Sequence, residues 1–299
     1  MKIKWANANF QCRQFLIRIL SSFIPLKKWR HSFRARYKMP NATNYKGILQ
    51  STVIIPLGEN CSCARILLDA GLRRYSLPFD WSGMGDEDIA SDVSGGLYTK
   101  CRLIIENCAG MLNFDDFEER ARERHNFDYN HRCVFNKKTG LRYLHDFSVS
   151  SSLSDQWPEF VEKYTRRIKR MYSEMEKAKR VLFVYDKVMR KENYYDKVMR
   201  KENYQARHNV ESYAFSYALL GILEEFKKKW PRKTFNFLIF LHDEGVNVRE
   251  YKEERPYDNI TYVYLNNVWQ HEESYDKNYW LGNKEVVLQY LKEHLTFCK

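Results

Sequence analysis

The sequence predicts an α/β fold: a mostly parallel sheet with helices on both faces, plus a peripheral basic helix at the N-terminus. Short apolar runs rich in β-branched residues alternate with amphipathic segments, which is typical of buried parallel strands connected by helices. The 299 residues are 44% hydrophobic and 29% charged, a composition that supports a substantial core and excludes a disordered chain. Basic residues are concentrated at the N-terminal end, which sets the first segment apart from the rest.

Residues 1–47 form a basic segment and a polar linker. Residues 1–40 hold ten Lys and Arg and no Asp or Glu, so they contribute +10 to the net charge of +12. The remaining chain is nearly neutral, which argues against a nucleic-acid-binding surface. In a helix, apolar residues would share one face beside the basic cluster at 27–38, a pattern typical of helices that lie on anionic lipid. The alternative is a helix packed on its own domain. The apolar face comprises Phe15, Leu16, Ile19, Leu20, Phe23 and Ile24.

The chain has features of a cytoplasmic protein. It lacks a run of about 18 apolar residues, and no small-residue cleavage site follows its best apolar stretch. We therefore expect neither a membrane-spanning helix nor an export signal, and residues 1–40 would bind at the inner face of the membrane. Seven cysteines, an odd number, fit a reducing compartment better than a disulfide framework.

The cysteines and histidines do not have the spacing of metal ligands. Cys61 and Cys63 are one residue too close for a zinc knuckle, and His125, His131 and Cys133 match no recognised ligand pattern. The sequence also contains no GxGxxG fingerprint and no phosphate-binding loop. We therefore expect no metal and no nucleotide cofactor.

Residues 48–299 form a single α/β domain in which strands and helices alternate. The apolar run 52–57 predicts a buried strand, and a glycine turn leads into a helix at 61–71. Residues 80–150 contain short irregular segments whose order the pattern does not fix. Amphipathic helices follow at 157–179, 209–229 and 283–294, and strands at 181–185, 235–241 and 260–265. The apolar stripe of the second of these helices comprises Val210, Tyr213, Tyr217, Leu220 and Leu223.

Ten residues are repeated in tandem, because the sequence of 185–194 recurs unchanged at 195–204. Ten extra residues inside a helix would rotate its apolar face by about 80°, whereas a loop tolerates extra length. We therefore expect the second copy to bulge outward between the strand ending at Tyr185 and the helix starting near Asn209. The functional alternative is a modified lid over the site.

Polar side chains follow each predicted strand. Cys61 follows the first strand, Asp186 the second, 242–244 (His-Asp-Glu) the third and 266–267 (Asn-Asn) the fourth. Ligands bind at the carboxyl ends of parallel strands, so these groups would line one candidate edge. A sugar-handling enzyme would use Asp186, Asp243 and Glu244 here, with Cys61 in a structural role.

Cys61 is the candidate nucleophile, because it opens a helix directly after a strand. Free N–H groups and the partial positive charge at a helix start lower a thiol pKa and can stabilise an oxyanion. The alternative is a small buried cysteine that packs against the turn.

Several short motifs carry a resemblance to a known family. They are Leu57-Gly58-Glu59-Asn60-Cys61-Ser62-Cys63-Ala64, Gly71-Leu72-Arg73, Pro78-Phe79-Asp80-Trp81, His145-Asp146-Phe147 and Trp280-Leu281-Gly282. In this order and spacing, residues 52–285 resemble a bacterial family of predicted papain-like cysteine peptidases of unknown function. The basic N-terminal segment lies outside the match and is similar to the leaders of bacterial enzymes that assemble surface polysaccharides.

The resemblance implies a Cys–His site. Cys61 would be the nucleophile and His145 the general base that takes its proton. Asp80 and Asp146 are the candidates to orient the imidazole, and Asn60 or the Cys61 backbone N–H would serve the oxyanion. The family name implies a papain-type fold with a helical half and a barrel-like half, but the pattern predicts α/β, and we expect α/β.

The roles of two further residues are not decided by the sequence. His242 ends a strand at the predicted edge, so in an α/β fold it rivals His145 as the base. Cys63 departs from the family pattern and is either a resolving thiol or a packing residue. The other histidines are expected to be solvated or hydrogen-bonded at the surface: His125, His131, His208, His271 and His294.

Three functions follow from these observations. The first is a cysteine hydrolase or acyl-transfer enzyme, tied to cell-envelope polysaccharide assembly by its leader, with an unknown substrate. The second is a glycosyltransferase-like or sugar-modifying enzyme. The third is a non-enzymatic binding module, in which the 15% aromatic content serves mainly the core.

Overall fold

The computed structural model describes residues 51–58, 61–84, 95–120, 130–187, 204–243, 251–266 and 283–295. Within these ranges, the side chains at 95, 204–216, 243 and 266 are not described. The expected basic helix in 1–47 and the candidate Asn60 lie outside the described residues, as do Glu244 and most of the duplicated segment.

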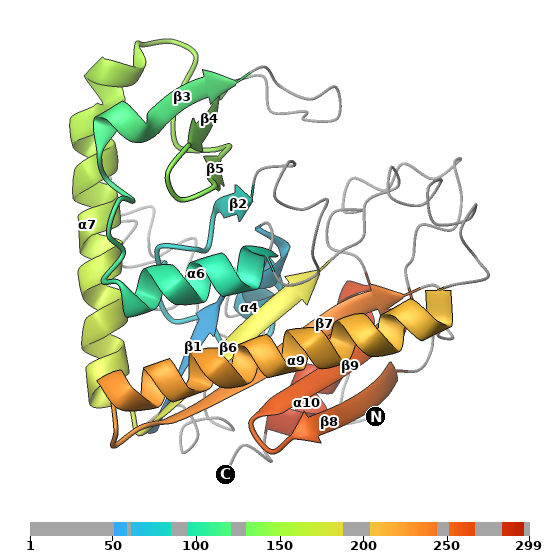
Figure 1. Ribbon diagram of the computed structural model, residues 1–299. Coiled ribbons are helices and arrows are strands. Elements are labelled where there is room, and N and C mark those ends of the chain that lie inside the picture. Colours follow the sequence, from blue (N-terminus) through green and yellow to red (C-terminus); the bar gives the residue numbers. More distant parts are fainter. Residues whose placement is uncertain are drawn as a thin grey trace, which may run out of the picture.

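The centre of the fold is a five-stranded sheet in the order β1-β6-β7-β9-β8 (Figure 1). Strands β1 (Thr52–Pro56), β6 (Arg180–Lys187), β7 (Thr234–Asp243) and β9 (Ile260–Asn266) are parallel, and β8 (Tyr251–Tyr257) pairs antiparallel with β9. The prediction of a mostly parallel sheet is confirmed. The sequence pattern missed β8 because this edge strand is largely polar and exposed.

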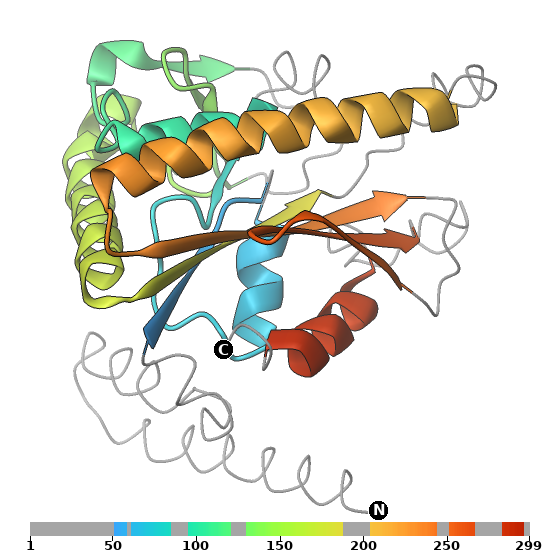
Figure 2. The same cartoon turned by 60° about the horizontal axis from the view of Figure 1, so that its bottom comes forward.

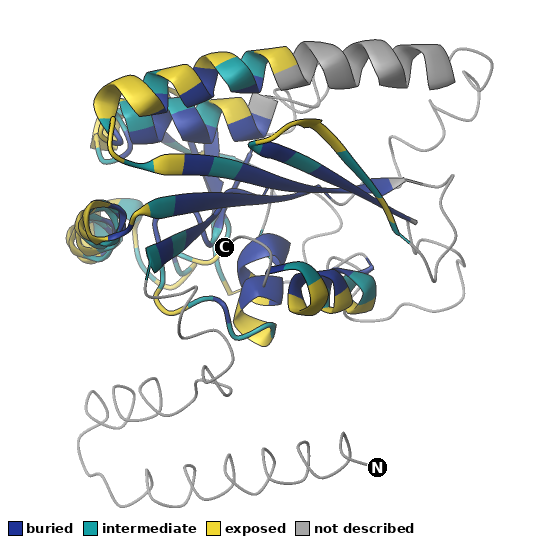
Figure 3. Ribbon diagram, turned by 90° about the horizontal axis from the view of Figure 1, so that it is seen from below, coloured by how far each residue is buried: buried dark blue, intermediate teal, exposed yellow. Residues whose placement is uncertain are grey.

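Helices cover both faces of this sheet, as predicted (Figure 2). Alternate residues of β6 separate the two cores: Val181, Phe183 and Tyr185 belong to one, Leu182 and Val184 to the other. The first core includes α6 (Gly95–Ile105), α7 (Leu153–Lys177) and α9 (Tyr204–Lys229). The second includes α4 (Ser62–Asp69) and α10 (Lys284–His294). Figure 3 shows α4 and α10 turning buried faces to the sheet and exposed faces outward.

Residues 82–143 contain a second sheet that the sequence analysis did not order. Its strands are β2 (Ser82–Met84), β3 (Phe117–Arg120), β4 (Cys133–Asn136) and β5 (Leu141–Tyr143), antiparallel in the order β2-β5-β4-β3. A short 3₁₀ helix, η1 (Phe114–Asp116), precedes β3. Strands of three or four residues are too short to show periodicity, and so their pattern could not be recognised. Aromatic rings join this sheet to α7, as in the perpendicular contact of Tyr143 and Phe160 at 5.1 Å.

Element boundaries differ from the prediction in ways that local chemistry explains. Helix α7 begins four residues early because the Ser152 side chain accepts a hydrogen bond from the Asp155 backbone N–H and caps the helix. Strand β6 continues to Lys187, so the duplicated segment begins inside the strand, and its last residue, Tyr204, begins α9. The expected bulge, at 188–203, lies outside the described residues.

The apolar stripe predicted for α9 was partly wrong. Tyr217 is 75% exposed, whereas Leu223 is buried and Leu220 packs against the core, as predicted. The side chains of Val210 and Tyr213 lie outside the described residues. Leu219, Ile222 and Phe226 complete the buried face. Tyr217 was wrongly assigned because aromatic residues of this helix lie both in the core, as Phe226 does, and at the surface. Within the described ranges, no helix is long and apolar enough to cross a membrane.

Candidate active site at the carboxyl end of β1

Cys61 lies where β1 has ended and α4 begins. It is the N-cap residue of α4, and its carbonyl oxygen accepts a hydrogen bond from the Arg65 backbone N–H at 3.0 Å. The residue is half-buried. Burial raises the pKa of the Cys61 thiol to about 11, against the opposing effects of its own backbone N–H, Lys100 and Arg142. The thiol of the resting protein is therefore neutral at pH 7.

A buried lysine that the sequence analysis missed lies beside this turn. Lys100 is 0% exposed, and its ammonium donates hydrogen bonds to the Gly58 carbonyl and, at 3.2 Å, to the Ser82 carbonyl. It occupies the buried stripe of α6, between Leu97 and Ile104. A lysine at a position where helical spacing demands an apolar residue is a pattern that could have singled it out.

His145 lies two residues beyond β5 and is exposed. Its ring meets the ring of Trp81 edge-on, with centroids 6.2 Å apart, and the ring of His131 at the same distance. Pairing of Ser82 with Tyr143 explains why: it brings the segment that holds Trp81 alongside the segment that holds His145. The structure thus brings together two motifs that are more than 60 residues apart in sequence.

The two carboxylates expected to orient His145 contact other groups. Asp146 accepts a hydrogen bond from the Tyr164 hydroxyl at 2.9 Å and forms an ion pair with Lys163 at 2.7 Å, both on α7. Asp80 forms a buried ion pair with Arg73, with its Oδ2 2.5 Å from Nη2 and 2.7 Å from Nε. The same oxygen accepts the Leu77 backbone N–H at 2.9 Å. Neither carboxylate is placed against the His145 imidazole.

His242 lies in a buried hydrogen-bond chain at the predicted strand edge. Its Nε2 is 2.9 Å from Asp186 Oδ1, and its Nδ1 accepts the Asn283 backbone N–H at 3.2 Å. The Asn283 donor fixes Nδ1 as the acceptor, so the proton of the neutral ring lies on Nε2 and points to Asp186. Asp186 Oδ2 in turn accepts the Ser62 hydroxyl at 2.6 Å.

These hydrogen bonds do not form a serine catalytic triad. In a triad the imidazole lies between the hydroxyl and the carboxylate, whereas here the carboxylate lies between the hydroxyl and the imidazole. The sequence correctly anticipated that Asp186 and His242 would meet at this edge, but both are buried. Of the acids assigned to a sugar-handling site, Asp186 has Ser62 and His242 as partners. The Asp243 side chain and Glu244 lie outside the described part of the chain.

Cys63 packs in the interior. It is buried in the core under α4, and its thiol donates a hydrogen bond to the Val184 carbonyl at 3.2 Å. Burial raises the pKa of this thiol well above the ordinary value, which keeps it protonated. Among the described residues, no group of three or more His, Cys, Asp or Glu side chains could hold a metal ion.

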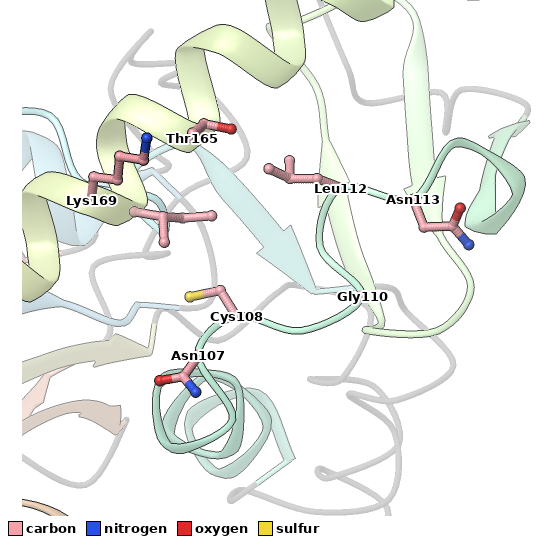
Figure 4. A pocket seen from close by; sticks show the side chains of 8 residues that line it. Asn107, Cys108, Gly110, Leu112, Asn113, Thr165 and Lys169 are labelled. Carbon is pink, nitrogen blue, oxygen red and sulfur yellow. The ribbon is translucent and has the colours of Figure 1, made fainter.

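A separate pocket of about 410 Å³ opens between the end of α6 and α7 (Figure 4). Its one thiol, Cys108, is buried 3.6 Å from the Tyr172 hydroxyl. Asn107 and Cys108 both have a φ of 58°, which turns the chain sharply after α6. The pocket does not include Cys61. Its lining comprises Asn107, Cys108, Gly110, Leu112, Asn113, Thr165, Ile168 and Lys169.

Together these features define an α/β protein with a half-buried thiol at the carboxyl end of the first parallel strand, flanked by two buried cations. Comparison with known proteins gives the family. Residues 52–225 match the model of the family described as "Putative papain-like cysteine peptidase", and the chain belongs to this family. The matched region includes Cys61, Lys100 and His145 but ends before His242.

A relative among curated proteins comes from a virus. An uncharacterized protein of Acanthamoeba polyphaga mimivirus is 28% identical over 148 residues, which cover 44% of this chain and 60% of the viral protein. The chain thus spans less than two thirds of that relative. No solved structure matches the chain.

Proposed function

We propose that this protein is a cysteine hydrolase or acyl-transfer enzyme, with Cys61 as the nucleophile and His145 as the general base. The observation that carries the proposal is the position of Cys61 at the start of α4, where it is half-buried. The other described cysteines, Cys63, Cys101, Cys108 and Cys133, are all buried. Membership of the cysteine peptidase family supports the same assignment.

The neutral resting thiol determines the chemistry of the first step. Because burial raises the pKa of Cys61 to about 11, attack requires a base that takes the proton as the bond forms. In this step sulfur bonds to the substrate carbonyl carbon, the thiol proton passes to a ring nitrogen of His145, and the carbonyl oxygen becomes an oxyanion. The leaving group then departs with the proton, leaving a thioester. Water or another acceptor then attacks the thioester carbon and gives a proton to His145; the C–S bond breaks, the acyl group leaves on the acceptor, and the proton returns to sulfur to restore the thiol.

Two observations favour His145 over His242 as this base. His145 is exposed and follows Arg142, whose charge acts on the Cys61 thiol. By contrast, both ring nitrogens of His242 have hydrogen-bond partners in the interior, so its proton is committed to Asp186. The region that matches the family supports the same choice, because it contains Cys61 and His145 but not His242.

An activated ester tests the assignment without knowledge of the natural substrate. We expect para-nitrophenyl acetate to acetylate Cys61 of the full chain, as measured by residue-resolved mass spectrometry after rapid quenching. Cys61→Ala should abolish this label, and His145→Ala should slow its formation by roughly 100-fold or more because no base takes the proton. His131→Ala is the matched control, since it removes a neighbouring imidazole on the same surface, and it should keep the wild-type rate.

Two results would contradict the proposal. Acetylation at another cysteine in preference to Cys61 would remove Cys61 as the nucleophile. Equal rates for His145→Ala and the wild type would remove His145 as the base.

We also propose that residues 1–40 hold the enzyme at the cytoplasmic face of an anionic membrane, where it would serve cell-envelope polysaccharide assembly. Ten basic residues without an acidic neighbour support the membrane part of this proposal. The polysaccharide part rests on the resemblance of this segment to leaders of envelope enzymes.

A further inference from the structure

Lys100 occupies a position where an apolar residue would be expected. On α6, the residues Leu97, Lys100, Cys101 and Ile104 recur at helical spacing, and all four are 0% exposed. The other three belong to the hydrophobic core between α6, α7, α9 and the sheet. The side chain of Lys100 therefore enters the molecule on the same face as its apolar neighbours.

The ammonium of Lys100 joins two segments that carry candidate site residues. It donates to the carbonyl of Gly58, three residues before Cys61 in the turn that follows β1. It also donates to the carbonyl of Ser82, the first residue of β2, directly after Trp81. One side chain thus ties the turn before the thiol to the strand that lies alongside the His145 segment.

Core packing alone does not explain a charge at this position. Removing an ammonium from water is costly, and lysine is rarely fully buried unless the charge is specifically compensated. Methionine has a similar length and would fill the same space in the core without that cost. The charge of Lys100 acts on Cys61, since it opposes the effect of burial on this thiol.

We propose that Lys100 is a positioning residue for the reaction of Cys61: it fixes the turn that holds the thiol and supplies the positive charge that stabilises the thiolate. The inference rests on the function proposed above. Lys100 transfers no proton in this role, and no bond to it forms or breaks. The ammonium is held by two carbonyls before the reaction starts, so it stabilises the developing negative charge without reorganisation.

The pH dependence of iodoacetamide labelling, resolved by residue, tests the inference in the full chain. In the wild type, we expect Cys61 to label slowly at pH 7 and about tenfold faster per pH unit as the pH rises toward about 11. Lys100→Met should lower the Cys61 rate about tenfold at a fixed pH below this range, because a nearby positive charge is lost. Lys100→Arg should stay close to the wild type because it retains the charge.

Cys108 provides an internal control. Burial also raises the pKa of its thiol to about 11, but the lysine that opposes this effect is Lys229. We therefore expect Lys100→Met to leave the Cys108 rate unchanged, and Lys229→Met to slow Cys108 but not Cys61. A reciprocal pattern of this kind reports local charge, whereas general loosening of the fold would expose both thiols and speed up both rates.

The outcomes separate this inference from the proposed function. An unchanged Cys61 rate in folded Lys100→Met overturns the inference, as does equal slowing in Lys100→Arg. If Lys100→Met does not fold, Lys100→Gln takes its place, since it removes the charge and keeps N–H donors at this position, and the same labelling rates decide. Failure of Cys61 to accept an acetyl group would overturn the proposed function and, with it, the role of Lys100 in that reaction, even where the labelling rate depends on Lys100.

Discussion

Asp80 and Arg73 form a buried ion pair at the base of the Trp81 segment. Their side chains are 0% and 8% exposed, and their closest atoms are 2.5 Å apart. Burial raises the pKa of the Asp80 carboxyl, and Arg73, the Leu77 backbone N–H and Arg167 oppose this rise. The carboxylate thus depends on its cationic partner to remain ionised, and its role at this position is to hold the turn that presents Trp81.

Removing Arg73 should therefore destabilise the protein strongly. We expect Arg73→Met to lower the free energy of unfolding by about 3–5 kcal/mol at pH 7, because the Asp80 charge is left buried without its partner. The loss should be smaller at pH 4. Without Arg73, burial raises the pKa of the folded-state Asp80 carboxyl further above its unfolded value, so the carboxyl is protonated at low pH. Stability is then lost as the pH rises and the buried carboxyl must ionise. Urea unfolding at both pH values measures this difference.

Arg65→Met provides the matched control. Arg65 pairs with Asp69 on the surface of α4 and is 48% exposed, so its loss should change stability by less than about 1 kcal/mol. Combining Arg73→Met with Asp80→Asn should cost less than the sum of the single changes. An additive result, or equal losses for Arg65→Met and Arg73→Met, would show that the buried pair is not coupled.

Individual site residues differed in how well the sequence could predict them. The position of Cys61 followed from a strand, a turn and a helix, all of which are local features. Partners of Asp80 and Asp146 could not be predicted, because they depend on side-chain directions in a region without periodicity. Lys100 was missed because helix α6 lies within residues 80–150, whose elements the sequence pattern did not order.

At the scale of elements, one hydrogen-bond chain joins four of them. Ser62 at the start of α4 donates to Asp186 in β6, Asp186 accepts from His242 in β7, and His242 accepts from Asn283, the N-cap of α10. All four residues in this hydrogen-bond network are buried. This hydrogen-bond network therefore fixes both helices of one face to the carboxyl ends of the central strands, and its first member, Ser62, directly follows Cys61.

Two substitutions at Asp186 distinguish the hydrogen bonds from the charge. In Asp186→Asn, the amide oxygen can still accept from His242, and the Ser62 hydroxyl can reverse and accept from the amide N–H. In Asp186→Ala, the buried Ser62 hydroxyl and His242 N–H both lose the carboxylate that accepts their hydrogen bonds. We expect Asp186→Ala to cost about 2–4 kcal/mol and Asp186→Asn about half as much or less, as measured by urea unfolding. Equal losses would show that the charge of Asp186, and not its hydrogen bonds, stabilises this edge.

Elements differ in predictability for a physical reason. The strands β1, β6, β7 and β9 are buried on both faces, so each appears in the sequence as a continuous apolar run. The strands of the second sheet are three or four residues long and stabilised by aromatic contacts to α7, which no local pattern reveals. The edge strand β8 contains Lys252, Glu253, Glu254 and Arg255, and such charges discourage pairing with another chain.

At the scale of the whole molecule, charge is distributed unevenly. Residues 1–40 contain ten basic and no acidic residues, which leaves 40 basic against 38 acidic residues in the remainder. Basic segments next to a nearly neutral body attract anionic surfaces through local charge and not through the net charge of the protein. We therefore expect attraction to an anionic membrane to come from this segment, with little contribution from the α/β body.

Three neutralising substitutions test this division in the intact chain. We expect the wild type to bind vesicles that contain phosphatidylglycerol, with an affinity that falls as salt is added. Combining Lys27→Gln, Lys28→Gln and Arg30→Gln should weaken this binding about 100-fold, since each basic residue near an anionic surface contributes about 1 kcal/mol. Co-sedimentation with vesicles, compared with phosphatidylcholine alone, measures the change.

The control changes the same number of charges on the body. Lys227→Gln, Lys228→Gln and Arg232→Gln lower the net charge by the same three units at and just beyond the end of α9. If the N-terminal segment provides the attraction, this triple variant should keep the vesicle affinity of the wild type within a few-fold. Equal weakening by the two triple variants would assign the attraction to net charge, and wild-type binding that persists in high salt would assign it to apolar insertion.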